Sequence, residues 1–230
     1  MGRRASATGS PSAPGAGSSR RRLPELPYAD RRAAGRALAA LLPREEDTIV
    51  LGLPRGGVPV AAEVARALGA ELDVFVVRKL GVPHQPELAF GAVATGGTRV
   101  LNDRVVCALG LSAETIDAVT RRELETLREQ EARLRGGRPA PRLGGRRVVI
   151  VDDGLATGAT MRAAVAAVRV QSPASLVAAV PVGARETCRL LEQDGTRVVC
   201  AALPEPFLAV GEWYRDFSQV SEGEVLALLA

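Results

Sequence analysis

The stretch 146–160, RRVVIVDDGLATGAT, constrains this chain most, because several kinds of local structure follow one another in it. Residues 148–151 form a continuous β-branched run, which is typical of a parallel strand buried on both faces. Two carboxylates, Asp152 and Asp153, follow at the carboxyl end of that strand, and a turn of small and hydroxyl residues comes next. Residues 161–170 then have the composition of a helix rich in Ala and Val. The stretch predicts a strand, an acidic pair, a turn and a helix start.

The turn after the acidic pair has the composition of an anion-binding loop. Small residues let a backbone wrap an anion, and the first turn of a helix offers unpaired N–H groups and a partial positive charge. A phosphate would therefore bind at residues 157–160, while two adjacent carboxylates would repel it but accept hydrogen bonds from sugar hydroxyls. The pattern predicts a phosphorylated sugar as ligand. The alternative, an ordinary strand-to-helix turn capped by Asp153, does not explain two acids followed by TGAT.

The placement of charge argues against a nucleic-acid binder. The net charge is +4, but the first 22 residues hold five arginines and no acid, which leaves +4 − 5 = −1 for the remainder. The pI of 9.5 therefore belongs largely to the N-terminal tail. An apolar content of 47% supports a hydrophobic core, and with 3% aromatic residues that core is mostly Ala, Val and Leu.

Cysteine use and hydropathy bear on the compartment. Three widely spaced cysteines without a CxxC pair indicate neither a disulfide framework nor a zinc site, which fits a reduced cytosol. No apolar run reaches membrane-spanning length, and the N-terminus lacks a hydrophobic signal segment. We expect a cytoplasmic protein with no membrane and no specific nucleic-acid partner. We expect residues 1–24 to be a disordered basic tail and residues 25–230 to form one domain.

Strands and helices are predicted to alternate along the chain. Buried strands are expected at residues 47–53, 72–77, 146–151, 176–180 and 197–201, and helices at 28–42, 58–68, 113–134, 161–170 and 225–229. This order predicts an α/β fold with a doubly wound, mainly parallel five-stranded sheet, which binds ligands at the carboxyl ends of its strands. Residues 79–102 are rich in Gly and Pro and are expected to form a flexible loop, with a hairpin at Thr95-Gly96-Gly97.

Basic residues follow the first two predicted strands. The first ends in Arg55-Gly56-Gly57, a cation with two permissive glycines, and the sequence after it does not fit a Walker A loop. The second ends in Arg78-Lys79, and Lys79 is the only lysine among 30 basic residues. Because composition alone would put an arginine here, one interpretation is that this position requires a compact, mobile ammonium instead of a planar guanidinium. The other is that Lys79 is a solvated loop cation, and both interpretations stay open. His84, the single histidine, is expected to be an exposed loop residue.

Aromatic residues gather late in the chain. Four of the seven, Phe207, Trp213, Tyr214 and Phe217, fall within eleven residues. Flat side chains of this kind stack on nucleobases. The alternative is a terminal segment that its aromatic residues pin onto the core.

The segments LPRGGVPVA, RKLGVPHQPELAFGAVA and VVIVDDGLATGAT resemble, in this order, type I phosphoribosyltransferases, and in particular bacterial stand-alone members of unsettled substrate. The resemblance covers roughly residues 47 to 217. It implies a flexible loop that closes over the substrate and a small C-terminal hood. It also implies an enzyme that transfers 5-phosphoribose from phosphoribosyl diphosphate (PRPP) to a nitrogen acceptor, a nucleobase or an amine. Pyrophosphate is released, and Mg²⁺ accompanies PRPP.

The resemblance implies roles for individual residues. Asp152 and Asp153 would hold the 2′- and 3′-hydroxyls, favour the positive charge that develops on the ribose, and bind Mg²⁺ directly or through water. The other PRPP-binding residues would be Gly154, Ala156, Thr157, Gly158, Ala159 and Thr160. Pyrophosphate would be bound by Arg55, Gly56, Gly57, Arg78 and Lys79, with Lys79 also catalytic. The acceptor would face Phe207, Val210, Gly211 and Trp213.

One position departs from the 6-oxopurine branch of this family. That branch has a third acid three residues after the acidic pair, where this chain has Ala156, so the acceptor class stays open. A non-catalytic sensor of PRPP or nucleotides on the same fold is the competing interpretation, and a homodimer is also left open. In the resembling family the peptide bond equivalent to Arg55–Gly56 can be cis, and we expect the same here.

Overall fold

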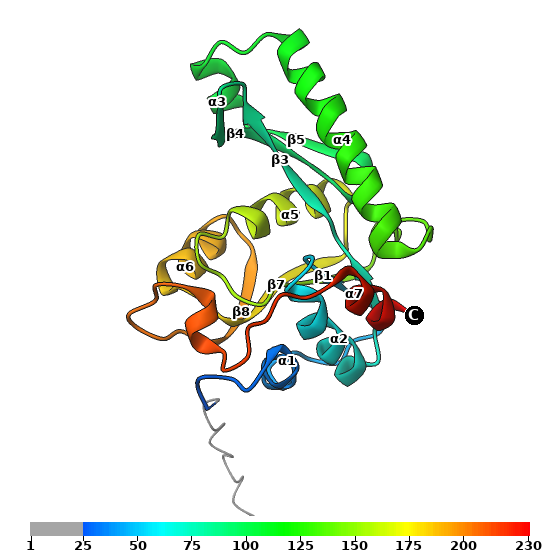
Figure 1. Ribbon diagram of the computed structural model, residues 1–230, viewed down its shortest axis with the longest axis vertical. Coiled ribbons are helices and arrows are strands. Elements are labelled where there is room, and N and C mark those ends of the chain that lie inside the picture. Colours follow the sequence, from blue (N-terminus) through cyan, green and yellow to red (C-terminus); the bar gives the residue numbers. More distant parts are fainter. Residues whose placement is uncertain (1–24) are drawn as a thin grey trace, which may run out of the picture.

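The structure, a computed structural model, describes residues 25–230, and of residues 86 and 87 only the backbone. Its centre is a five-stranded sheet in the order β2-β1-β6-β7-β8, in which all four pairings are parallel (Figure 1). The strands are β1 (Thr48–Gly52), β2 (Glu71–Val74), β6 (Arg147–Val151), β7 (Ser175–Val182) and β8 (Arg197–Ala202). The predicted doubly wound parallel sheet is confirmed. The predicted basic tail, residues 1–24, lies outside the described part of the chain.

Helices cover both faces of this sheet, as its continuous apolar strands require. On one face, α1 (Arg31–Ala39) and α2 (Gly57–Leu68) pack against side chains such as Val50 and Val149. On the other face, α5 (Ala159–Val170) and α6 (Arg185–Gln193) pack against side chains such as Ile49 and Ile150. Alternate residues of β1 and β6 therefore enter different clusters, and both strands are buried almost throughout.

A second, antiparallel sheet projects from the first (Figure 1). It consists of β3 (Val77–Val82), β4 (Gln85–Ala94) and β5 (Thr98–Leu101), in a segment whose sequence predicts a long loop. The Gly and Pro residues of this segment are typical of loops, and they outweighed the apolar residues that indicate strands. Two of those apolar residues, Leu80 and Phe90, are fully buried in the small sheet. The predicted hairpin is confirmed, because the short helix η1 (Thr95–Gly97) joins β4 to β5. His84 is exposed at the turn between β3 and β4, as expected.

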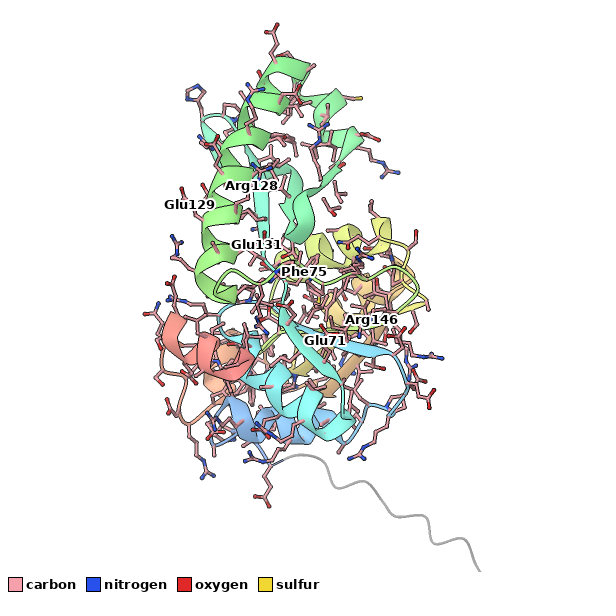
Figure 2. The ribbon with its side chains drawn as sticks, turned by 90° about the vertical axis from the view of Figure 1, so that its right-hand side faces the viewer. Glu71, Phe75, Arg128, Glu129, Glu131 and Arg146 are labelled. Atoms are coloured by element: carbon pink, nitrogen blue, oxygen red, sulfur yellow. The ribbon has the colours of Figure 1, made fainter. Side chains whose placement is uncertain are left out.

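The small sheet is backed by the long helix α4 (Ala113–Arg135), which Ser112 caps by accepting a hydrogen bond from the N–H of Thr115. One face of α4 buries Leu127 and Leu134, while Arg128 and Glu129 point outward (Figure 2). The remaining helices are α3 (Asp103–Ala108), η2 (Val210–Trp213) and α7 (Glu222–Leu229), and α7 adds Val225 and Leu229 to the same apolar cluster. The charged α4 is thus half core and half solvated surface.

The strand order places a topological switch point between β1 and β6. From β1 the chain moves to β2 on one side, whereas β6 and the later strands lie on the other. The two segments that leave β1 and β6 stay together, because the backbone N–H of Leu53 donates to the carbonyl oxygen of Val151 over 2.8 Å. Ligands of doubly wound sheets bind at such a point. Across residues 25–230, no helix combines the length and hydropathy needed to cross a bilayer.

Candidate active site

The acidic pair leaves β6 at the switch point, as the sequence predicts. Asp152 and Asp153 are each partly buried, and the backbone N–H of Asp153 donates to Oδ1 of Asp152 over 2.9 Å. Burial and, to a smaller extent, the neighbouring charge of Asp153 together raise the pKa of the Asp152 carboxyl to about 8. Burial also raises the pKa of Asp153, against a hydrogen bond and a charge from Arg31 that lower it. Two carboxylates in this setting favour a bound cation or hydroxyl donors.

The loop after β1 packs directly on the acidic pair. A Cβ atom at Gly57 would lie 2.6 Å from the carbonyl oxygen of Val151, and one at Gly56 would overlap Oδ2 of Asp153. These two glycines therefore permit a backbone approach that a larger residue would block. The structure brings Gly56 and Gly57 against the acids, and Arg55 directly precedes them in the same loop. The cis peptide bond lies between Pro54 and Arg55, one bond before the predicted Arg55–Gly56, so that prediction is wrong.

The turn from Gly154 to Thr160 forms a small cradle beside the acids. It encloses about 140 Å³ and is lined by Asp152, by the turn itself and by Val210. α5 begins after Gly158, whose φ of 70° favours glycine, and this helix start has no side-chain cap. Its first N–H groups therefore remain available to an anion, with Thr157 and Thr160 exposed next to them.

Thr187 of α6 supports this turn through a hydrogen bond and a close packing contact. The hydroxyl of Thr187 donates to the carbonyl oxygen of Ala156, and its methyl group would lie 2.6 Å from a Cβ atom at Gly158. Thr187 is buried, so the bond is shielded from water. Sequence reasoning missed Thr187, because nothing local to α6 indicates that it contacts a turn 31 residues earlier.

Arg31 is the second residue that the sequence did not reveal. Its Nε donates to Oδ2 of Asp153 over 2.8 Å, and its guanidinium carbon lies 3.9 Å from the centroid of the Phe217 ring. With 29 arginines in the chain, composition does not single out any one of them. The contact spans 122 residues, so no sequence spacing points to it.

Arg78 and Lys79, predicted to bind pyrophosphate together, point in different directions from β3. Arg78 forms an ion pair with Glu123 of α4, with Nε and Oε2 2.7 Å apart. Lys79 is exposed and lines a cavity of about 520 Å³ together with Ala159 at the start of α5. Alternation along a strand explains the divergence, because neighbouring side chains face opposite sides of the small sheet. Lys79 thus shares a cavity with the first residue of α5, whereas Arg78 is engaged by α4.

The predicted acceptor residues form a hood that packs largely on itself. The rings of Phe207 and Trp213 stack with centroids 6.4 Å apart, and Phe217 covers Gly211. Val210 closes onto Gly154, where a Cβ atom would overlap its side chain. The packing favours the reading in which the aromatic residues pin the terminal segment onto the core, and Val210 lines the cradle, while stacking on a nucleobase stays a prediction.

The donor set at the acidic pair fits Mg²⁺ bound with a phosphorylated substrate. Within residues 25–230, no three His, Cys, Asp or Glu side chains are arranged to hold a metal ion by themselves. Mg²⁺ is commonly held by one or two carboxylates and completes its shell with waters and substrate phosphates. Asp152 and Asp153 offer that number of carboxylates beside an anion cradle.

Comparisons with known proteins agree with this geometry. The family model of the phosphoribosyl transferase domain matches residues 29–205. Two Mycobacterium tuberculosis proteins, named "Putative phosphoribosyl transferase MT0597" and "Putative phosphoribosyl transferase Rv0571c", are each 51% identical over 204 residues. The match covers 88% of this chain and 46% of each relative, so the chain spans about half the length of these relatives.

A solved structure has the same fold and a similar sequence. The crystal structure of TT1426 from Thermus thermophilus superposes with a TM-score of 0.81 at 44% identity. The superposition covers 88% of this chain and 97% of that one. From the family match over residues 29–205 and these relatives, the chain belongs to the phosphoribosyl transferase domain family.

Proposed function

We propose that the protein transfers 5-phosphoribose from PRPP to a nitrogen acceptor, a nucleobase or an amine, and releases pyrophosphate. The observation that carries the proposal is the union of an acidic pair and an uncapped helix start at the switch point of the sheet. A phosphate on the turn and hydroxyls on the acids would hold both ends of a phosphoribose at once. Such double anchoring fixes C1 against a nucleophile and removes much of the entropic barrier.

Electrostatics at the site suit the bond that must break. Loss of pyrophosphate leaves positive charge on the ribose ring, and we assign the stabilisation of that charge to the carboxylates of Asp152 and Asp153. Arg55 and Lys79 are the cations that we assign to the leaving pyrophosphate, and Gly56 and Gly57 let the backbone approach it closely. Bound Mg²⁺ would neutralise charge on the pyrophosphate oxygens.

The acceptor is the part of this proposal with the fewest constraints. The turn has Ala156 where 6-oxopurine enzymes carry a third acid, so a base that needs a carboxylate at this position is disfavoured. The test is pyrophosphate release from PRPP and Mg²⁺ across a panel of pyrimidines, purines, other bases and small amines. Release that depends on one acceptor class supports the proposal, and its absence across the panel argues against catalysis.

Two ion pairs favour a second candidate, a non-catalytic sensor of PRPP. Arg31 engages Asp153 and Arg78 engages Glu123, so two predicted ligand-binding side chains already have protein partners. A sensor would bind PRPP without releasing pyrophosphate for any acceptor. Calorimetric binding of PRPP, measured beside the release assay, distinguishes the two functions.

A further inference from the structure

Arg31, the first residue of α1, reaches the acidic pair across the hood interface. Its Nε lies 2.8 Å from Oδ2 of Asp153, and the two side chains are 11% and 15% exposed. A charge-assisted hydrogen bond that is largely shielded from water is short and directional. This contact therefore fixes the orientation of the carboxylate as well as its charge.

The contact uses one oxygen of Asp153 and leaves the other to a ligand. Oδ2 faces Arg31 and the backbone at Gly56, where no Cβ atom would fit. Oδ1 accepts no hydrogen bond from the described residues. It is nevertheless accessible to solvent, because the only side-chain atoms of the described residues that are both buried and unpartnered are Thr120 Oγ1 and Trp213 Nε1. Oδ1 is thus the oxygen that remains open to a hydroxyl.

Arg31 is itself held by the C-terminal segment. Its guanidinium carbon lies 3.9 Å from the Phe217 ring centroid, a favourable cation–π position, and its NH1 donates to the carbonyl oxygen of Ser218 over 2.8 Å. Tyr214, three residues before Phe217, donates its phenol to the carbonyl oxygen of Asp153. One short segment therefore fixes both partners of the ion pair.

We propose that Arg31 is a positioning residue for ribose recognition, which holds Asp153 by Oδ2 so that Oδ1 is presented to a ribose hydroxyl. The inference rests on the proposed function, because it takes a phosphoribose as the ligand. Arg31 acts through Asp153 and not on the pyrophosphate. Its loss should therefore weaken ligands that carry the ribose hydroxyls and spare inorganic pyrophosphate.

The test compares two probes, PRPP and inorganic pyrophosphate, by calorimetry in the presence of Mg²⁺. Arg31→Gln should raise the Kd for PRPP at least tenfold and change the Kd for pyrophosphate by less than twofold. Arg32→Gln is the matched control, because Arg32 is the exposed neighbour on the same helix and forms no ion pair within residues 25–230. It should leave both values unchanged.

Two further variants keep the test informative if Arg31→Gln unfolds. Arg31→Lys keeps the charge but lacks the planar fork and its stacking on Phe217, so its affinity for PRPP should be intermediate. Phe217→Leu removes the support beneath the guanidinium. It should weaken PRPP binding severalfold in the wild-type background and have little effect once Arg31 is already glutamine.

The outcomes separate this inference from the proposed function. If the wild-type protein binds PRPP and Arg31→Gln behaves like Arg32→Gln, the positioning role is wrong while the function stands. If Arg31→Gln weakens both probes equally, Arg31 supports the fold only, and the inference is again overturned. If the wild-type protein does not bind PRPP, the proposed function fails and the inference fails with it.

Discussion

The phenol of Tyr214 donates a hydrogen bond to the backbone carbonyl oxygen of Asp153, which ties the C-terminal segment to the acidic pair. Tyr214 is 6% exposed, and burial raises the pKa of its phenol, so the group remains a protonated donor. The same segment reaches the N-terminal part of the chain, because the N–H of Tyr28 donates to the carbonyl oxygen of Trp213 over 2.8 Å. The segments around Tyr28 and Tyr214 therefore meet beside the site.

Removal of this phenol should disturb the acids as well as the fold. Tyr214→Phe leaves the carbonyl of Asp153 without its partner, so we expect a loss of about 1 kcal/mol in unfolding free energy and a severalfold weaker affinity for PRPP. Tyr28→Phe is the control, since its phenol donates over 3.0 Å to the carbonyl oxygen of Pro181 and not to either acid. The control should lose similar stability in urea and keep its PRPP affinity. Equal PRPP affinities for the two variants would contradict the coupling.

The raised pKa of Asp152 predicts a pH-dependent stability in the absence of metal. The pKa in the folded protein is about 8, above the ordinary value of 3.8, so the folded state holds a proton that the unfolded state releases. The protonated Asp152 carboxyl therefore contributes fully to the free energy of unfolding below pH 4, and this contribution is lost as the pH rises towards 8. In EDTA, Asp152→Asn should be more stable than wild type at pH 8, and the two should converge near pH 4.

A control variant shows whether that pH dependence belongs to Asp152. Glu125→Gln neutralises an exposed acid on α4 and should follow the wild-type curve throughout. Urea midpoints measured from pH 4 to pH 8 give all three curves. Parallel curves for wild type and Asp152→Asn would show that the carboxyl titrates as it does in water.

The close approach at Gly56 should be intolerant of any side chain. A Cβ atom there would overlap the carboxylate of Asp153, so Gly56→Ala must displace either the loop or the acid. We expect at least a tenfold loss of PRPP affinity. Gly223→Ala is the control, because the nearest atom to its Cβ atom, Ser221 Oγ, is 3.9 Å away. Wild-type PRPP affinity in Gly56→Ala would mean that the loop does not form part of the site.

Lys79 provides a test of the cation assigned to the leaving group. If it acts in the transition state, Lys79→Ala should lower kcat for pyrophosphate release about tenfold with little change in PRPP affinity. Lys79→Arg should restore part of the rate, because a guanidinium differs in reach and hydration. Arg121→Ala on the exposed side of α4 should change neither value. A normal kcat in Lys79→Ala would contradict this assignment and show that Lys79 is a solvated surface charge.

Sequence reasoning located what depends on local pattern. The β-branched run, the acid pair and the turn from Gly154 to Thr160 lie where predicted, because strand, turn and helix start are each coded by adjacent residues. The five parallel strands followed from the alternation of apolar runs with helical segments. Paired glycines after β1 were identified as permissive, and the structure gives the reason at Gly56 and Gly57.

The features that the sequence did not predict depend on contacts between segments that are distant in the chain. Arg31 meets Asp153 across 122 residues, and Thr187 supports Ala156 across 31, and neither spacing carries a pattern. The strands β3 and β4 were expected to be a loop, because their glycines and prolines outweigh a weak alternation that becomes a core only when α4 packs on it. Arg78 was assigned to pyrophosphate on position alone, without knowledge of Glu123.

The most direct test of this account is PRPP binding by the acidic pair. Calorimetry in Mg²⁺ should show PRPP binding to wild type and an affinity lower by at least tenfold, about 1.4 kcal/mol, for Asp152→Asn and for Asp153→Asn. Thermal melts should show that both variants remain folded. Unchanged PRPP binding and unchanged pyrophosphate release in the double variant would contradict the assignment of these two carboxylates to the ribose.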